Sequence, residues 1–187
     1  MAATAISLSA GAAHADDLVQ KIRATTDTYQ RYVDLLDSSS QATRIAALTE
    51  MTKSKDTALV DLAIEKGLSS RDDAMLAIAA RAAFRQVRSI VARVNAPQPP
   101  TAQSQEVVKL CGDGVQYSID KFNAETGQFE ARGQDHVGVG QINGASLSLT
   151  IEYGCSLTGV LQPDGTFSGM VSAPYRKGAL PAKFAFR

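Results

Sequence analysis

The most regular pattern of hydrophobic and polar positions lies between residues 147 and 161. Polar and apolar side chains alternate there, and this period of two places the two sets on opposite faces of a half-buried antiparallel strand. Because strands usually run about 5–6 residues, we place a bend or bulge at Gly154, where glycine tolerates the required backbone angles. The apolar set consists of Leu147, Leu149, Ile151, Tyr153, Cys155, Leu157 and Leu161.

A tight turn is predicted at Pro163-Asp164-Gly165. Proline fixes the φ angle that a type I turn needs, and glycine supplies the left-handed residue that follows. A three-residue loop sets Leu161 opposite Phe167, whereas a two-residue Asp-Gly loop sets Leu161 opposite Ser168. Burial favours the three-residue loop, because a slip of one residue turns the apolar side chains toward solvent.

A second hairpin is predicted around residues 124–127. A four-residue loop there sets Phe122 across from Phe129. The same register sets Lys121 across from Glu130, and both are favourable cross-strand pairs.

The remaining strands follow the same alternation. Val137 and Val139 precede Asn143-Gly144, a strong hairpin signal. A two-residue loop at that dipeptide would pair Val139 with Ser148, outside the apolar set, so this register stays open. Residues 179–187 alternate as a closing strand, which makes roughly seven strands and predicts a small antiparallel barrel or sandwich.

The first part of the chain has helical periodicity instead. Over residues 16–37, apolar and aromatic side chains recur at spacings of four and three, as expected for one stripe along a helix. Asp16 and Asp17 lie at its start, where the helix dipole favours negative charge. The stripe consists of Leu18, Ile22, Thr25, Tyr29, Tyr32 and Leu36.

Three further helices are predicted before residue 96. The first two cover residues 41–53 and 56–66, with Gly67 as a left-handed residue that ends the second. The longest begins at Ser70-Arg71-Asp72-Asp73 with a pattern similar to a capping box. Its apolar band continues to Asn95, before a run of prolines.

Arginines lie opposite the apolar band of this longest helix. Arg81, Arg85 and Arg88 form a predicted basic stripe that is a candidate site for an anionic partner, such as an acidic protein face or a lipid head group. The alternative is a solvated face, since arginine near a helix C-terminus also interacts favourably with the dipole.

Residues 96–105 are rich in proline and carry no charge, which predicts a semi-rigid spacer. We therefore expect a helical domain over 16–95 and an antiparallel β domain over 106–187 that begins with a strand at Val107. The predicted fold class is α+β, with an antiparallel helical bundle followed by a small β-barrel or sandwich.

Residues 41–84 resemble a HEAT-type helical repeat. The matching features are an Arg and an Ala-Ala-Leu core in the first helix, a short polar turn, a helix that closes at Gly67-Leu68, and Asp72-Asp73 at the next helix start. The match covers about one and a half repeats, whereas solenoids need about three. The resemblance implies a protein-binding scaffold, and an ordinary four-helix bundle is the alternative.

Charge excludes some classes of function. The 187 residues carry 19 basic and 19 acidic side chains, without the basic excess that a nucleic-acid binder needs to neutralise phosphates. No apolar run in the sequence approaches the roughly 20 residues that cross a bilayer.

Residues 1–15 resemble the latter part of a secretory signal peptide. Small and apolar residues lead to Ala13-His14-Ala15, an A-x-A cleavage pattern, and Asp16 follows directly. A basic n-region is missing, which suggests a true start further upstream or weak export. We expect a periplasmic or secreted protein; the alternative is an alanine-rich tail on a cytosolic one.

Two cysteines, Cys111 and Cys155, lie in the part that we expect to be rich in strands. In an oxidising compartment they are expected to form a disulfide bond that stabilises the fold by roughly 4 kcal/mol. The alternative is a pair of buried, reduced thiols.

Candidate catalytic groups are few. His136 is the single histidine after the signal-like segment, and no dinucleotide, P-loop or Gly-x-Ser-x-Gly motif occurs. His136 precedes Gly154-Cys155-Ser156 in an order loosely similar to the L,D-transpeptidase pattern, which implies a thiolate nucleophile. The serine, second histidine and arginine of that pattern are absent here, and we predict neither a metal site nor a cofactor.

These observations favour an exported, non-catalytic binding or assembly protein of the bacterial envelope, with the helical domain engaging a protein partner. One alternative is a carrier of a small apolar or glycan ligand that uses the β domain. A Cys/His enzyme based on Cys155 and His136 is the third hypothesis.

Overall fold

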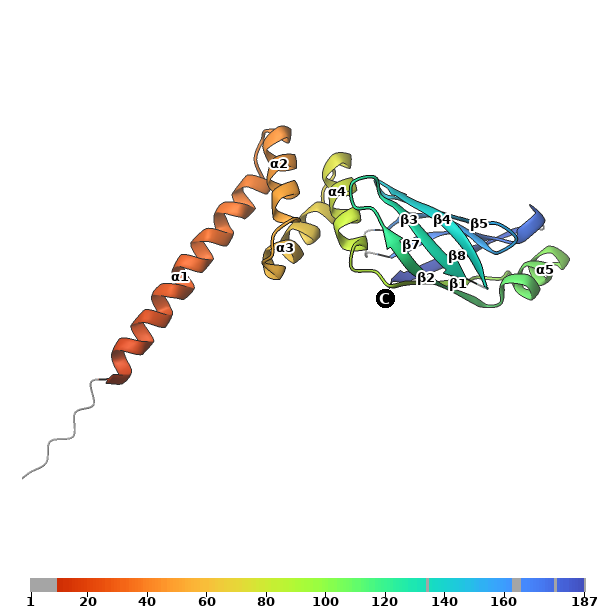
Figure 1. Cartoon of the computed structure of the whole chain (residues 1–187), viewed down its shortest axis with the longest axis horizontal. Helices are drawn as coiled ribbons and strands as arrows, with labels where there is room; N and C mark the ends of the chain where they lie inside the picture. The colour runs from red at the N-terminus through yellow and green to blue at the C-terminus, as the bar shows by residue number, and fades with distance from the viewer. Residues whose placement is uncertain (1–9, 134, 163–165, 177, 187) are drawn as a thin grey trace, which may run out of the picture. The chain divides into compact units, whose positions relative to one another are not determined.

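A computed structural model describes residues 10–133, 135–162, 166–176 and 178–186 of the chain (Figure 1). The chain divides into two compact units, Met1–Ala47 and Leu48–Arg187. The segment 96–105, proposed above as a spacer between domains, lies inside the second unit.

Helix α1 (Ala10–Leu36) occupies most of the first unit, and helix α2 (Gln41–Met51) begins in it. The link between them is fixed by Arg44, whose Nη1 donates a hydrogen bond of 2.8 Å to the carbonyl of Ser38. The predicted helices over 16–37 and 41–53 are both present, with α1 starting earlier and α2 ending two residues sooner.

Helices α3 (Thr57–Leu68) and α4 (Asp73–Phe84) pack against each other in the second unit. The carboxylates of Asp56 and Asp72 cap their N-termini by accepting hydrogen bonds from backbone N–H groups one turn on. The N-cap of α4 is therefore Asp72, and the predicted start at Ser70 is wrong by two residues.

The prediction that Gly67 ends α3 is also wrong. Gly67 lies inside the helix and is buried, and the helix ends at Leu68. A Cβ atom at this position would collide with the Cβ of Ala79 on α4. The glycine is therefore needed for the close approach of two helices rather than for a left-handed turn.

The predicted continuation of α4 to Asn95 is wrong as well. The helix ends at Phe84, and Ser89–Val94 forms strand β1, in which Ile90 and Ala92 are fully buried. The spacing of Val87, Ile90, Val91 and Val94 fits one face of a helix, but β-branched side chains also suit a strand that pairs on both sides.

Helix α5 (Ala102–Cys111) replaces the expected end of the spacer and the strand expected at Val107. Thr101 and Ser104 form a capping box at its start. Val107 and Cys111, four residues apart, share the buried face. The predicted β domain over 106–187 thus begins with a helix, and Cys111 is helical.

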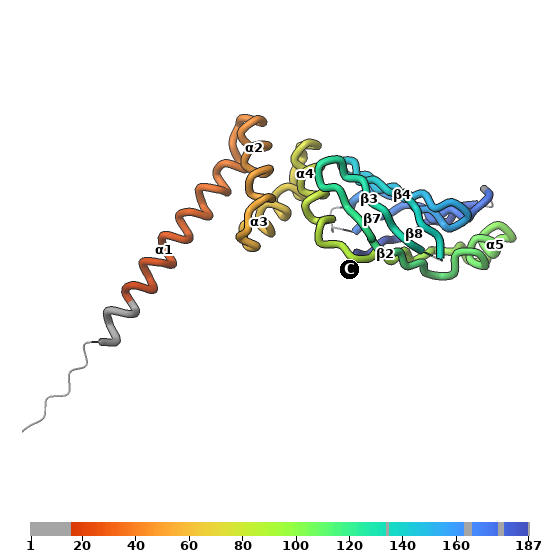
Figure 2. Tube along the Cα trace, viewed as in Figure 1, coloured from red at the N-terminus to blue at the C-terminus, as the bar shows by residue number. Residues whose placement is uncertain are grey.

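The strands form a closed eight-stranded antiparallel barrel in which each strand pairs with its sequence neighbour and β8 pairs with β1. The colour gradient in Figure 2 follows this path from green to blue. A 3₁₀ turn, Pro174–Arg176, precedes the last strand. The strands after β1 are β2 (Gly114–Phe122), β3 (Gln128–Gly133), β4 (His136–Asn143), β5 (Ser146–Ile151), β6 (Ser156–Leu161), β7 (Phe167–Ser172) and β8 (Ala179–Phe186).

The predicted α+β class is confirmed, and the β part is a barrel rather than a sandwich. Helices α2, α3 and α4 fall in the range that resembles a HEAT repeat, 41–84, but a HEAT-type arrangement is not confirmed.

Two hairpin registers agree with the sequence analysis. Phe122 pairs with Phe129, and the ammonium of Lys121 lies 2.8 Å from the carboxylate of Glu130. Leu161 pairs with Phe167 as the three-residue loop requires; the loop itself, 163–165, lies outside the described residues.

The open register at Asn143-Gly144 is resolved by a loop one residue further along the chain. Asn143 pairs with Ser146, so Gly144 and Ala145 form the turn and Val139 faces Thr150. Gly144 has a φ of +57°, which glycine adopts without strain.

The long alternating run over 147–161 contains a reversal rather than a bend. Strands β5 and β6 pair with each other, with Leu149 opposite Leu157. Tyr153 lies at the apex with a φ of +63° and is 59% exposed instead of facing inward. Gly154 follows it in the same turn, where its N–H donates to the carbonyl of Ile151.

The barrel interior is a packed apolar core. Glycines on the inner face leave room for rings: a Cβ at Gly140 would meet Phe129, and one at Gly159 would meet Phe184. Helices α4 and α5 lie at opposite ends of the barrel (Figure 1). The ring of Phe84 at the end of α4 contacts Phe122, Phe129 and Phe186.

Candidate binding surfaces

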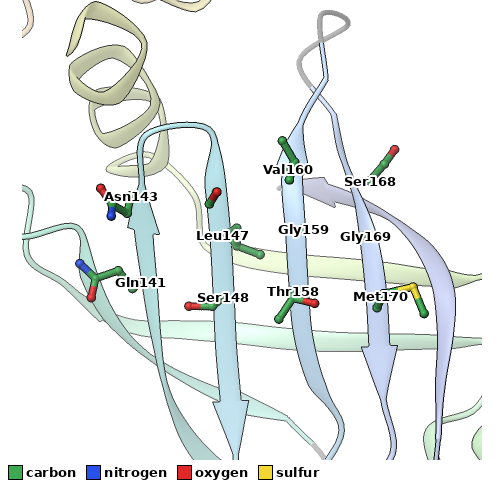
Figure 3. A pocket seen from close by; sticks show the side chains of 11 residues that line it. Gln141, Asn143, Leu147, Ser148, Thr158, Gly159, Val160, Ser168, Gly169 and Met170 are labelled. Atoms are coloured by element: carbon green, nitrogen blue, oxygen red, sulfur yellow. The ribbon is translucent and has the colours of Figure 1, made fainter. Parts of the chain in front are cut away.

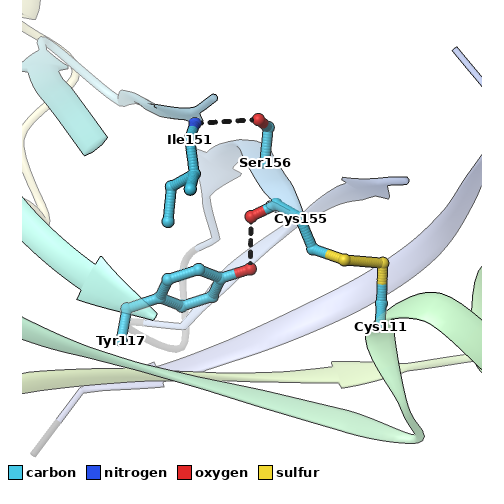
Figure 4. The surroundings of a disulfide bond; sticks show 5 residues. All are labelled: Cys111, Tyr117, Ile151, Cys155 and Ser156. Atoms are coloured by element: carbon cyan, nitrogen blue, oxygen red, sulfur yellow. Dashed lines mark hydrogen bonds between the residues drawn. A yellow bond between two sulfur atoms is a disulfide. The ribbon is translucent and has the colours of Figure 1, made fainter. Parts of the chain in front are cut away.

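The α5 end of the barrel is held by a disulfide bond between Cys111 and Cys155, with Cα atoms 5.8 Å apart. The hydroxyl of Tyr117 donates a hydrogen bond of 2.7 Å to the carbonyl of Cys155 (Figure 4). Ser156 Oγ accepts one from the N–H of Ile151. The predicted disulfide is confirmed, and burial raises the pKa of the Tyr117 phenol well above its usual range.

His136 lies beside the turn between β5 and β6 that contains Gly154. It begins β4, and its Cβ would be 3.7 Å from a Cβ at Gly154. The histidine and Cys155 are thus brought to the same end of the barrel. Because the Cys155 sulfur is bonded to Cys111, it carries no thiolate in this structure, and the Cys/His enzyme hypothesis lacks its nucleophile. Within the described residues, His, Cys, Asp and Glu form no group of three able to hold a metal ion.

The three arginines do not form one stripe along a helix. Arg81 lies in α4 and donates a hydrogen bond of 3.2 Å to the carbonyl of Glu125 in the β2–β3 loop. Arg85 caps the helix and donates one of 3.2 Å to the carbonyl of Thr52. Arg88 is exposed just before β1. Two of the three therefore connect α4 to neighbouring segments, and a role in partner binding stays a prediction.

An apolar cavity of about 140 Å³ lies between α4 and the adjacent end of the barrel. Its volume is comparable to an engineered cavity that admits benzene and well below the roughly 300–1,000 Å³ of ordinary ligand pockets. It therefore does not hold a lipid-sized ligand in this conformation. The lining residues are Leu68, Ala80, Ala83, Phe84, Val87, Ile142, Leu161, Phe167 and Phe186.

A larger open hollow of about 390 Å³ lies on the outer face of β4–β7. Two rows of side chains cross the strands there (Figure 3). One row contains Gln141, Ser148, Thr158 and Met170, and the other contains Asn143, Ser146, Val160 and Ser168. Every side chain in these rows is uncharged, so the hollow offers hydroxyl and amide groups beside two apolar side chains.

The alternation over 147–161 predicted an outward-facing polar set that includes Ser148 and Thr158. It gave no reason to group them with Gln141, Asn143, Ser168 or Met170, which lie on other strands. A signal was present in the sequence: residues 136–172 contain no Lys or Arg and only two acids, Glu152 and Asp164.

The most extended apolar surface among the described residues of the first unit lies on α1. Every described side chain from 16 to 28 is exposed, including Leu18 at 59% and Ile22 at 55%. Burial increases only toward the C-terminal end, where Leu36 is enclosed. The stripe predicted over 16–37 is therefore covered at one end only. The A-x-A pattern at Ala13-His14-Ala15 falls within α1, and residues 1–9 lie outside the described part.

Comparison with known proteins gave no significant match to any protein-family model, curated protein or solved structure. Across the described residues, the helices all lack the combination of length and apolar character needed to span a bilayer.

Proposed function

We propose that this chain is an exported, non-catalytic binding or assembly protein of the bacterial envelope whose N-terminal helical segment engages a protein partner. The observation that carries the proposal is the exposed apolar face of α1. The disulfide-bonded barrel belongs to the second compact unit of the same chain.

An uncovered α1 lacks the stabilisation that burial of its apolar side chains would provide. Complete burial of a Val, Leu or Ile side chain stabilises a structure by about 1.5–3 kcal/mol relative to exposure. Leu18, Val19, Ile22 and Leu35 are 42–59% exposed. Most helical stability in proteins comes from packing of such a face rather than from intrinsic propensity. A partner that covers these side chains would therefore order and stabilise the helix.

Two observations support export. A disulfide such as Cys111–Cys155 persists in oxidising compartments and is rare in the cytosol. The segment 1–15 resembles a cleavable signal. N-terminal sequencing of the protein from fractionated cells tests export: a periplasmic or secreted form beginning at Asp16 is expected, whereas a cytosolic form retaining residues 1–15 contradicts it.

Photocrosslinking in intact cells of the source organism tests the partner. A benzophenone side chain placed at Ile22, on the apolar face, is expected to crosslink to protein. The same group placed at Asp27, on the polar face, is the matched control. Equal crosslinking from both positions, or none from Ile22, contradicts the proposal. The crosslinks from Ile22 should also disappear when Leu18 is changed to Glu.

A second candidate function is binding of a neutral glycan in the outer hollow of β4–β7. The uncharged hydroxyl and amide lining favours a ligand that is itself neutral and rich in hydroxyl groups. Titration calorimetry with neutral oligosaccharides tests this: Ser148→Glu should abolish binding, whereas Gln116→Glu, an exposed position on β2, should not. Absence of binding by the unaltered protein contradicts it.

A further inference from the structure

The apolar stripe of α1 follows a seven-residue repeat. Its spacings of four, three, four, three and four continue without interruption from Leu18 to Leu36. In heptad notation, Ile22, Tyr29 and Leu36 occupy position a, and Leu18, Thr25 and Tyr32 occupy position d; we call these six positions the seam. Leu36 is already buried, so the part of the seam open to a partner runs from Leu18 to Tyr32. An ideal straight helix drifts from a seven-residue repeat by only about 20° per heptad, so over this length the seam can pack along one face of another helix.

The positions beside this seam are almost free of charge. Positions e and g hold Val19, Val33, Leu35, two threonines and a single charged residue, Lys21. Lys21 is turned to the polar face, where its ammonium lies 2.8 Å from the carboxylate of Asp17. Apolar residues at a, d and e form the wider band of a helix that packs in a bundle.

The two threonines can also be buried without loss of hydrogen bonds. The hydroxyl of Thr26 donates to the carbonyl of Ile22 at 2.9 Å, and that of Thr28 donates to the carbonyl of Ala24 at 2.8 Å. Their donors are satisfied within the helix, so a partner would contact their methyl groups. This removes the usual cost of burying an unpaired hydroxyl.

The remaining charged side chains lie on the opposite face of α1. They occupy positions b, c and f. Over residues 16–36 these are Asp16, Asp17, Arg23, Asp27, Arg31 and Asp34. Together with Lys21, the helix carries four acids and three bases in this range. Helices that lie on membrane surfaces are rich in Lys and Arg on this face. The slight acidic excess of α1 therefore favours a helical protein partner over a lipid surface.

A second copy of the same helix fits both the apolar band of α1 and its nearly uncharged flanking positions. It offers an apolar band of the same width, and its flanking positions hold no acid and only the one base, so two copies bring no series of like charges together. We infer that α1 associates with α1 of a second copy of this chain to form an intermolecular helical bundle. This inference rests on the proposed function and identifies the partner as the chain itself.

Sedimentation equilibrium of the full chain over a hundredfold range of concentration tests the inference. The unaltered protein is expected to dimerise or form a larger oligomer, and Ile22→Asp should make it monomeric. Gln20→Asp introduces the same charge on the polar face at position f, and this control should assemble like the unaltered protein. A monomeric unaltered protein, or an oligomer that survives Ile22→Asp, overturns the inference.

A benzophenone at Ile22 in the purified protein identifies what covers the seam. Crosslinks between α1 segments of two copies are expected, identified by mass spectrometry of isotope-mixed samples. Crosslinks to Leu48–Arg187 of the same chain overturn the inference, as does binding to phosphatidylglycerol vesicles that depends on Ile22. If the purified protein stays monomeric while Ile22 still crosslinks to another protein in cells, the proposed function holds and the inference alone fails.

Discussion

The hydroxyl of Tyr117 donates a 2.7 Å hydrogen bond to the carbonyl of Cys155, the residue that forms a disulfide bond with Cys111. One buried phenol on β2 therefore fixes the backbone of the turn between β5 and β6 at the residue where α5 is attached. The noncovalent and covalent links meet at a single residue, and both should contribute measurably to stability.

We expect Tyr117→Phe to lower the free energy of unfolding by about 1–3 kcal/mol, because the buried carbonyl of Cys155 loses its donor. Denaturant titration followed by circular dichroism measures the change. Tyr153→Phe removes a hydroxyl from an exposed side chain in the same turn and should change stability by less than about 0.5 kcal/mol. Equal effects of the two substitutions would refute the role given to Tyr117.

Removal of the disulfide should cost about 4 kcal/mol. Cys111 and Cys155 are 44 residues apart in sequence, and the entropy of closing a loop of that length sets the estimate. Unfolding of the protein with Cys111→Ser and Cys155→Ser, compared with the oxidised unaltered chain, measures the loss. If the unaltered protein is equally stable with and without reductant, the bond does not constrain the unfolded chain.

Stability should decrease at alkaline pH in a way that depends on Tyr117. Burial raises the pKa of this phenol above its ordinary value of 10.0, so the folded state retains the proton that the unfolded state releases. The contribution of the protonated Tyr117 phenol to the free energy of unfolding is complete below about pH 10. It is lost as pH rises from there toward the folded pKa, by up to about 1.4 kcal/mol per pH unit. The unaltered protein should lose more stability above that pH than Tyr117→Phe, and parallel pH profiles would exclude this explanation.

Gly140→Ala should destabilise the barrel by about 1–3 kcal/mol, because its methyl group would meet the ring of Phe129 inside a filled core. Gly114→Ala is the matched control: a Cβ there has the carbonyl oxygen of Ala92 as its nearest neighbour, at an ordinary 3.5 Å. Thermal unfolding measures both. If Phe129→Leu restores part of the stability lost in Gly140→Ala, the ring is the group that the glycine accommodates.

Local signals in the sequence were enough to predict several parts of this structure. The register that pairs Phe122 with Phe129 follows from turn chemistry and alternation over a few residues, and the structure confirms it. The disulfide was predictable because the chain has two cysteines and hence one intramolecular pairing. The register depends on residues close together in sequence, and the disulfide has one possible pair of cysteines.

Only part of the outer hollow on β4–β7 could be predicted from the sequence. Ser148 and Thr158 belong to the polar set of the alternating run over 147–161, whereas Gln141 and Met170 become their neighbours only through cross-strand pairing. Alternation identifies which residues point outward on each strand. It does not state which outward residues of different strands become neighbours, since that depends on every register between them.

By itself, the sequence determined the α+β class, the order of most helices and strands, two hairpin registers and the identity of the disulfide pair. The tertiary structure decided that Ser89–Val94 is a strand, that 102–111 is a helix, and that the sheet closes into a barrel. The physical reason is that the apolar spacing of Ser89–Val94 suits either a helix or a strand. The choice depends on pairing with β2 and with β8, and β8 is the last strand of the barrel, far from Ser89–Val94 in sequence.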